Sequence, residues 1–241
     1  MAKLKKALIT GAAVGIGKAI ALDLASRNFD VAIHYRSSKE EAEKTCQEAL
    51  DFGTEAFTLQ ADVTNPQEAK NLVEKAAQGL GGLSVVVNNV GNYLETITSQ
   101  VSVEEWQEII DSNLNATFYV TQAALPHLRK AKWGRIINLG FASAQNVLAR
   151  KNITPYVIAK TGIIIYTKSL AKGIIEENIT ANVVSPGVVE NSIDLNNFIP
   201  KLPSKRPASF PELTNAVWFF VNPDACYITG QVLEVSGGWN L

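Results

Sequence analysis

The chain has 241 residues, of which 46% are hydrophobic and 19% charged, a composition usual for a globular protein that buries one large core or two small ones. Its 22 basic and 23 acidic residues leave a net charge of −1, too small to hold the chain on nucleic acid or an anionic membrane. Two isolated cysteines, Cys46 and Cys226, exclude a disulfide scaffold and a cysteine-based zinc site. No apolar run has the length of a membrane span or a signal peptide, so we expect a cytoplasmic protein without nucleic-acid or membrane partners.

Seven apolar runs rich in β-branched residues alternate with stretches of helical periodicity. Most of these runs are unbroken, as expected of strands buried on both faces of a parallel sheet. The alternation predicts an α/β, doubly wound fold in which the loops after the strands lie along one edge, where ligands bind. The expected strands cover residues 7–10, 31–35, 56–60, 83–88, 135–139, 179–184 and 232–235, and the main expected helices cover 18–27, 38–51, 65–77, 103–128 and 155–170. Asn65 followed by Pro66 predicts a capped helix start with proline at the first helical position.

No linker, repeat or low-complexity tract interrupts residues 1–241, so we expect a single domain. Residues 187–211 differ from the rest of the chain, because they are rich in proline and show no clear helical or strand periodicity. A long irregular segment in a compact domain is usually functional, which predicts a substrate loop here. The alternative is a surface excursion without a role.

The first expected strand runs into the glycine-rich sequence TGAAVGIG at residues 10–17, which a helix follows. Glycines let the backbone turn tightly and approach a pyrophosphate, and the helix start offers unpaired N–H groups to the anion. The spacing is GxxxGxG rather than GxGxxG, and packing alone also produces glycine-rich turns. The strand before and the helix after favour a dinucleotide site.

The end of the second expected strand indicates which dinucleotide binds. A site for NAD usually carries a carboxylate at this point for the ribose hydroxyls, whereas a 2′-phosphate requires a cation. This strand ends in Arg36 and Ser37, and the first carboxylate after it is Glu40. Arg36 and Ser37 could bind a phosphate through charge-assisted hydrogen bonds, so NADP(H) is favoured. The alternative is that Arg36 is a solvated loop charge.

Tyr156 and Lys160 are four residues apart at the start of an expected helix, so their side chains share one helix face. A lysine ammonium beside a phenol favours the phenolate and lowers the phenol pKa from about 10. Such a tyrosine can exchange a proton with a carbonyl oxygen while a hydride is transferred at carbon. A YxxxK match alone also arises by chance.

The order of several motifs resembles the short-chain dehydrogenase/reductase family. These are TGAAVGIG at residues 10–17, Asp62-Val63, NNVG at 88–91, Asn113, YVIAK at 156–160 and SPG at 185–187. The resemblance covers nearly the whole chain and is far more specific than any single motif. It implies one Rossmann domain with a seven-stranded parallel sheet that binds a nicotinamide dinucleotide.

The resemblance also implies roles for individual residues. The pyrophosphate would lie on Gly11, Val14 and Ile16, the adenine amino group would bind Asp62 with Val63 beside the ring, and Asn89 and Gly91 would line the adenosine ribose. Tyr156 and Lys160 would be catalytic and would contact the nicotinamide ribose, Val189 would meet the carboxamide through its backbone, and Asn113 would bend its helix and hold a water that leads protons to Lys160.

The chain departs from the family pattern at the serine that hydrogen-bonds the substrate carbonyl. When positions are counted forward from Asn113 and the fifth expected strand, Phe141 falls where the family has this serine. Phenylalanine cannot donate a hydrogen bond. Counting back thirteen residues from Tyr156 reaches Ser143. We therefore expect Ser143 to be either a substitute catalytic donor or a plain loop serine.

Together these features predict an NADPH-dependent reductase of a carbonyl, similar to the 3-oxoacyl-acyl-carrier-protein reductases, acting on a small-molecule or acyl-thioester substrate. The family resemblance implies that the protein assembles as a homotetramer. The alternative chemistry is pteridine reduction, since pteridine reductases also vary the serine. Acidic Glu176 and Glu177 lie where the acyl-carrier enzymes tend to be basic.

A rival function of another class is an NADP-binding sensor or scaffold with weak catalysis. Phe141 favours this alternative, and Tyr156 argues against it. His34 and His127 have no metal-ligand spacing, so no metal is expected.

Overall fold

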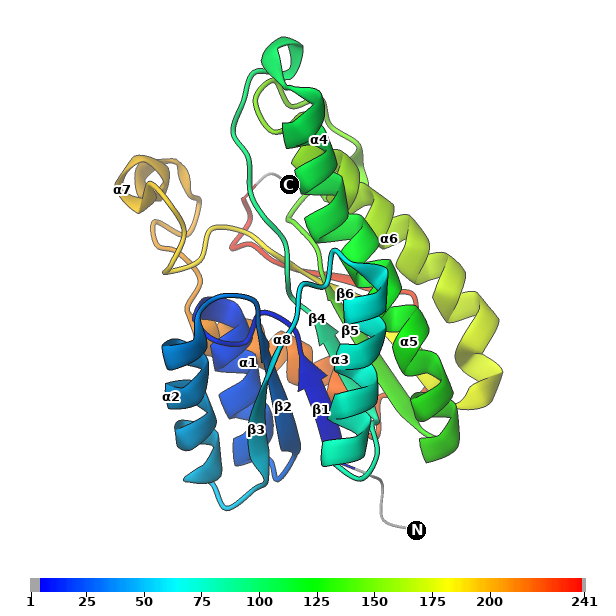
Figure 1. Cartoon of the computed structure of the whole chain (residues 1–241). Coiled ribbons are helices and arrows are strands. Elements are labelled where there is room, and N and C mark those ends of the chain that lie inside the picture. The colour runs from blue at the N-terminus through cyan, green and yellow to red at the C-terminus, as the bar shows by residue number, and fades with distance from the viewer. Residues whose placement is uncertain (1–4, 240–241) are drawn as a thin grey trace.

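The structure, a computed structural model that describes residues 5–239, contains a seven-stranded parallel sheet with helices on both faces (Figure 1). The strand order is β3-β2-β1-β4-β5-β6-β7, which confirms the predicted doubly wound architecture. The strands are β1 (Lys6–Ile9), β2 (Asp30–Tyr35), β3 (Ala56–Gln60), β4 (Val85–Asn88), β5 (Gly134–Leu139), β6 (Ile179–Pro186) and β7 (Val232–Val235).

Helices α1, α2 and α8 cover one face of the sheet, and α3, α5 and α6 cover the other (Figure 1). Helices α4 and α7 stand beyond the carboxyl ends of the strands (Figure 1). In residues 5–239, none of the helices combines the length and apolarity that crossing a membrane requires. The helices are α1 (Gly15–Ser26), α2 (Lys39–Leu50), α3 (Pro66–Gly79), α4 (Val103–Ile110), α5 (Ala116–Ala131), α6 (Thr154–Ile174), α7 (Leu195–Phe198) and α8 (Phe210–Val221).

Each central strand contributes side chains to two separate cores. In β1, Ala7 and Ile9 belong to the core under α1 and α8, whereas Leu8 belongs to the core under α3 and α5. In β4, Val87 faces the first core and Val86 the second. Because successive side chains of a strand point to opposite faces, a strand buried on both faces needs apolar residues at every position. This is why the strand sequences read as unbroken runs.

The sheet reverses its winding between β1 and β4. The chain moves outward from β1 to β2 and β3, then returns to place β4 on the other side of β1. At such a point the loops after the two strands diverge to opposite faces and leave a crevice between them. The fold therefore places a ligand crevice at the carboxyl ends of β1 and β4.

The long helix expected over residues 103–128 contains one irregular turn. A π-helical turn, η2 (Asp111–Asn115), joins α4 to α5. A π turn inserts an extra residue into the helix, and such turns are frequent at functional sites. This turn holds Asn113, whose predicted effect was to bend this helix.

The expected substrate loop, residues 187–211, leaves β6 and returns to α8. It contains two short elements, α7 and the 3-10 turn η5 (Ile199–Lys201). Its two ends are joined by a parallel bridge between Val189 and Ala208, with Ala208 donating to Val188 and Glu190 donating to Ala208, both at 2.9 Å. These two hydrogen bonds thus hold the ends of the segment together, and the residues between them extend away from the bridge.

Helix α3 begins as the sequence predicts. The Asn65 side chain accepts hydrogen bonds from the backbone N–H groups of Gln67, at 2.9 Å, and Glu68, at 3.1 Å, and Pro66 occupies the first turn. These bonds satisfy two donors that a helix start leaves without intrahelical partners.

We expect Asn65→Ala to lower the free energy of unfolding by about 1 kcal/mol, because both capping bonds are lost. Urea denaturation monitored by circular dichroism measures this change. Asn65→Asp, which keeps a capping oxygen, serves as the control and should remain near wild type. Equal stability of the alanine and aspartate variants would contradict the capping role.

Candidate active site

A cleft of about 300 Å³ opens at the carboxyl ends of β1 to β4. Its walls are the turns that follow these four strands, so it lies in the crevice that the strand order creates. The predicted cofactor residues Gly11, Val14, Arg36, Ser37, Asp62, Val63, Asn89 and Gly91 line it. Ile16 packs against the core below, and Tyr156, Lys160 and Val189 are outside this lining.

The turn after β1 depends on glycine for close packing. Gly11 and Gly15 have φ values of +62° and +59°, in the left-handed region that glycine adopts without strain. A Cβ on Gly17 would lie 2.2 Å from the carbonyl oxygen of Gly11. The Asn89 amide donates to the carbonyls of Thr10 and Gly11, both at 3.0 Å, and so ties this turn to the end of β4.

The N-terminus of α1 is suited to an anion. Val14 is its N-cap residue, has an extended backbone, and makes no side-chain cap hydrogen bond. The first N–H groups of a helix have no intrahelical acceptor and carry the positive end of the helix dipole. Val14 is also exposed and borders the cleft. These donors therefore fit the pyrophosphate of a dinucleotide.

His34, at the end of β2, joins the phosphate turn to the end of β3. Its Nδ1 accepts from the backbone N–H of Gly11 at 3.0 Å, and its Nε2 lies 3.0 Å from the carbonyl oxygen of Ala61. These partners assign the proton of a neutral ring to Nε2. Burial lowers the pKa of His34 and favours this neutral form. The sequence predicts no metal-ligand role for His34 and neither of these contacts, because one histidine in a strand does not reveal bonds to two other loops.

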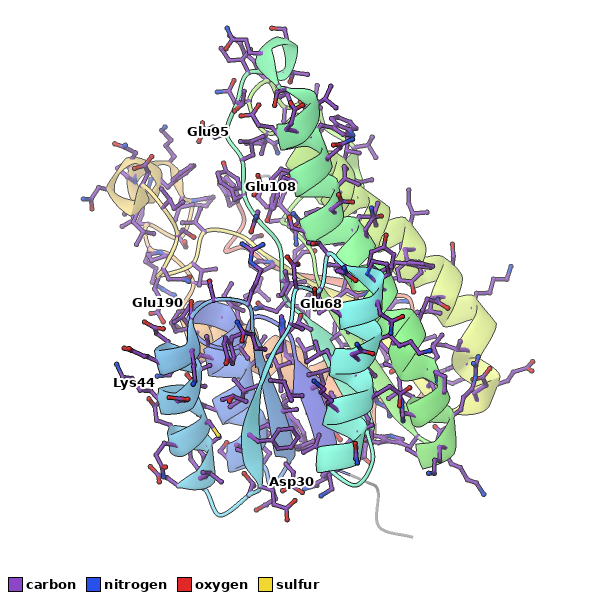
Figure 2. The ribbon with its side chains drawn as sticks, viewed as in Figure 1. Asp30, Lys44, Glu68, Glu95, Glu108 and Glu190 are labelled. Atoms are coloured by element: carbon purple, nitrogen blue, oxygen red, sulfur yellow. The ribbon has the colours of Figure 1, made fainter. Side chains whose placement is uncertain are left out.

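The far end of the cleft holds Arg36 and Asp62 on the turns after β2 and β3. Partial burial opposes ionisation of Asp62, but hydrogen bonds from Thr64 and the charge of Arg36 lower its pKa. The backbone N–H of Asp62 donates to the Glu68 carboxylate at 2.8 Å, which anchors this turn on α3 (Figure 2). A fixed carboxylate beside an arginine can bind an amino group and a phosphate of one ligand.

Helix α6 carries Tyr156 and Lys160, whose ammonium nitrogen lies 5.5 Å from the centre of the tyrosine ring. Lys160 is 4% exposed and donates to the carbonyl of Leu139 at 2.9 Å. Burial lowers the pKa of Lys160 to about 8. Burial, followed by the neighbouring Tyr93, raises the pKa of Tyr156 above its ordinary value.

The structure therefore differs from the expectation that Lys160 lowers the pKa of Tyr156. The ammonium hydrogen bond goes to Leu139, and desolvation of the phenol dominates. Tyr156 is thus a protonated phenol at neutral pH, which is the form that donates a proton.

Asn113 lies beside Lys160 in the buried interior. Its amide nitrogen donates to the carbonyls of Asn92, at 2.9 Å, and Ile109, at 3.0 Å. Its Oδ1 is buried and has no hydrogen-bond partner among residues 5–239. A Cβ on Gly91 would lie 2.2 Å from this oxygen and 3.4 Å from the Lys160 nitrogen, so the three residues converge. A buried acceptor of this kind normally has a partner, which makes Asn113 Oδ1 suited to a water.

Phe141, rather than a hydroxyl residue, contacts Tyr156 on the side of β5. The two rings are 5.4 Å apart, edge to face. Ser143 is buried in the same loop with φ +67°, and its hydroxyl accepts a hydrogen bond from Arg150 at 2.9 Å. The catalytic role of Ser143 stays a prediction, and its hydroxyl, which accepts from Arg150, keeps its own hydrogen to donate.

The substrate loop reaches the phosphate turn. The N–H of Val189 donates to the Ser192 hydroxyl at 2.9 Å. A Cβ on Gly15 would lie 2.7 Å from the Asn191 amide nitrogen, so Asn191 and the turn are in close proximity. Sequence reasoning missed Asn191 and Ser192, because an irregular segment gives no periodicity from which to place a side chain.

A protein-family model described as enoyl-(acyl carrier protein) reductase matches residues 11–240. The curated 3-oxoacyl-[acyl-carrier-protein] reductase FabG of Staphylococcus aureus is 35% identical over 241 residues, covering 97% of each chain. With this coverage, the chain belongs to the short-chain dehydrogenase/reductase family, whose members are NAD(P)-dependent oxidoreductases of the kind that the FabG enzymes represent.

Solved structures agree with this assignment. A short chain dehydrogenase from Burkholderia cenocepacia in complex with NADP has a TM-score of 0.92 at 29% identity and covers 99% of each chain. A blue fluorescent protein from a metagenomic library, in complex with NADPH, has a TM-score of 0.92 at 32% identity and covers 98% of each chain.

The buried His34 makes stability depend on pH. Below the ordinary imidazole pKa of about 6.5 the unfolded chain binds a proton that folded His34 resists, so stability falls as pH decreases, by at most about 1.4 kcal/mol per pH unit. We expect His34→Gln to be less stable than wild type at pH 7.5 but to lose less stability between pH 6.5 and 5.

Urea denaturation across this pH range measures both effects. His127→Gln, which removes the other histidine of the chain, is the matched control. Parallel pH profiles for wild type and His34→Gln would show that His34 is not held neutral by the fold.

Proposed function

We propose that this protein reduces a carbonyl compound with NADPH and that Tyr156 donates the proton. The observation that carries the proposal is the position of Tyr156, Lys160 and Asn113 next to a cleft whose uncapped α1 N-terminus and Arg36 suit a phosphorylated dinucleotide.

The described residues fit the cofactor at several points. The N-terminus of α1, with Gly11, Val14 and Ile16, would bind the pyrophosphate. Arg36 and Ser37 would bind the 2′-phosphate, which selects NADPH over NADH. The NADP and NADPH in the complexes of the two solved relatives support this preference. Asp62 and Val63 would contact the adenine, Asn89 and Gly91 the adenosine ribose, Tyr156 and Lys160 the nicotinamide ribose, and the backbone of Val189 the carboxamide.

The bound cofactor would supply the hydride that forms the new C–H bond. The Tyr156 O–H bond breaks as its proton moves to the carbonyl oxygen, and the raised phenol pKa keeps this proton in place at neutral pH. Lys160, whose ammonium nitrogen lies 5.5 Å from the centre of the Tyr156 ring, would offset part of the charge of the phenolate that forms. Asn113 Oδ1 would hold a water on the path that returns a proton toward Lys160.

We infer an acyl thioester, such as a 3-oxoacyl carrier, as the reference substrate, because the FabG relatives are described as 3-oxoacyl-acyl-carrier-protein reductases. Residues 187–211 would cover it, since this loop projects beside the cleft from a pinned base. One observation favours a pteridine as the second candidate, namely the Phe141 ring against Tyr156 where the family has a serine.

Assembly as a homotetramer fits the outer faces of α5 and α6. Phe118 is 43% exposed, Ile158 43% and Ile165 62%, so these two helices present apolar side chains to the surroundings. Exposed apolar patches commonly mark interfaces between subunits.

We expect Tyr156→Phe to lower kcat for carbonyl-dependent NADPH oxidation by at least about 10²-fold, because the proton donor is removed. NADPH binding, measured by fluorescence titration, should weaken far less than kcat falls, because the α1 N-terminus and Arg36 keep their contacts with the phosphates. Tyr166→Phe, in the same helix and bonded to Gln122 outside the site, is the control. Undiminished turnover by Tyr156→Phe would refute the assignment. Tight NADPH binding without turnover of any carbonyl by the wild type would instead support the sensor or scaffold alternative.

We expect Arg36→Ala to raise the KM for NADPH about tenfold or more and to leave the KM for NADH nearly unchanged, because charge-assisted hydrogen bonds to the 2′-phosphate are lost. Steady-state kinetics with both cofactors measure the difference. Lys39→Ala removes a neighbouring cation that pairs with Glu43, and it should behave as wild type. Equal losses with both cofactors would place Arg36 away from the 2′-phosphate.

A further inference from the structure

Five aromatic rings form a continuous row through Tyr156. Tyr93 lies 5.2 Å from Tyr156 and Phe141 5.4 Å from it, between ring centres. Trp239 lies 5.9 Å from Phe141, and Phe198 lies 6.2 Å from Trp239. All four contacts are edge to face, with interplanar angles from 73° to 86°.

These rings come from separate parts of the chain. Tyr93 is in the segment between β4 and α4, which also carries the labelled Glu95 (Figure 2), and Phe141 follows β5. Phe198 belongs to α7 in the substrate loop, and Trp239 follows β7. Sequence periodicity does not explain such a row, because no single helix or strand generates it.

The row is accessible as well as packed. Tyr93 is 46% exposed, and Phe141, Phe198 and Trp239 are each partly exposed. Further exposed apolar side chains lie in the loops after the same strands, with Leu148 at 47% and Ile193 at 73% exposure. Large apolar patches left open by a folded chain commonly mark ligand-binding surfaces.

Of the two rings that contact Tyr156, Phe141 has no donor for a carbonyl and Tyr93 has only its hydroxyl. A substrate here would therefore be held mainly by contacts with rings, and aromatic rings favour other rings at centre separations of about 4.5–7 Å.

We propose that the substrate carries a planar aromatic or heteroaromatic ring next to the reacting carbonyl, and that Tyr93, Phe141 and Trp239 bind this ring. The proposal rests on the proposed reductase function and, of the two candidate substrates named there, favours the ring compound over the acyl thioester. The ring lies along the row while the carbonyl oxygen meets the Tyr156 hydroxyl. Phe141 thus selects the substrate at the position where the family has a hydrogen-bond donor.

The test compares an aryl and an alkyl compound that share a vicinal dione. We expect wild-type kcat/KM with NADPH to be at least about tenfold higher for 1-phenyl-1,2-propanedione than for 2,3-hexanedione, through contacts of the kind that aromatic pairs make. A dihydropterin and an acetoacetyl thioester, assayed beside them, separate a heteroaromatic substrate from an acyl chain. Preference for the alkyl dione, or for the thioester over both ring compounds, would overturn the proposal.

Substitutions of the ring residues test whether these rings cause the preference for the aryl dione. Phe141→Leu and Trp239→Leu should each reduce the aryl-to-alkyl ratio by roughly three- to tenfold, whereas Tyr93→Phe, which keeps the ring and loses the hydroxyl, should retain it. Phe219→Leu, an exposed ring on α8, is the surface control. An unchanged ratio in both leucine variants would overturn the proposal.

A measurement of dione binding tests the ring site even if the proposed reductase function is wrong. If no carbonyl is turned over, calorimetric titration of both diones into protein saturated with NADP⁺ still measures ring preference. Tighter binding of the aryl dione, lost in Phe141→Leu, would support the ring site while refuting reduction. Equal binding of both diones would overturn the ring site.

Discussion

The cleft depends on the hydrogen bonds by which the Asn89 amide joins the ends of β4 and β1. By donating to the carbonyls of Thr10 and Gly11, Asn89 fixes the turn that leads into α1. The turn can lie this close only because Gly17 lacks a side chain against the Gly11 carbonyl. The result is a helix N-terminus aimed into the crevice where the sheet reverses. His34, on β2, accepts a hydrogen bond from the same turn. The two strands that flank β1, namely β2 and β4, therefore both hold this turn in place.

The proposed catalytic end is assembled differently, from polar groups buried between α6 and the helix that carries η2. Desolvated groups of this kind are stable only when their hydrogen bonds are made inside the protein. Lys160 satisfies this through Leu139, and the Asn113 amide through Asn92 and Ile109. The π turn is the local distortion that contains Asn113. The exception is the side-chain oxygen Oδ1 of Asn113, which has no hydrogen-bond partner among residues 5–239. It lies near the Lys160 nitrogen, where a proton path would pass.

The sequence predicted the strands well, because burial on both faces leaves an unbroken apolar signature that few other elements share. Local spacing also predicted the Asn65 cap and the pairing of Tyr156 with Lys160, and the family resemblance implied the place of Asn113 near Lys160. The resemblance implied a bend at Asn113, but its form as a π turn was not predictable, because the residues around Asn113 continue the helical pattern without a break. The hydrogen bonds of His34 and the row of rings depend on which loops the sheet brings together. The count across the loop after β5 left Phe141 and Ser143 unresolved for the same reason, and the geometry brings Phe141 to Tyr156.

The bridge between Val189 and Ala208 has a consequence for how this scaffold diversifies. Because the two ends of the segment are hydrogen-bonded to each other, the chain between them forms a closed excursion whose length and composition are decoupled from the sheet. Extra residues inserted there would cost little more than the entropy of a longer closed loop, which grows only slowly with length. Residues 190–207 could therefore change, by evolution or engineering, to accept other chemistry above Tyr156 while the sheet stays as it is, provided that Asn191 keeps its place against Gly15 of the phosphate turn.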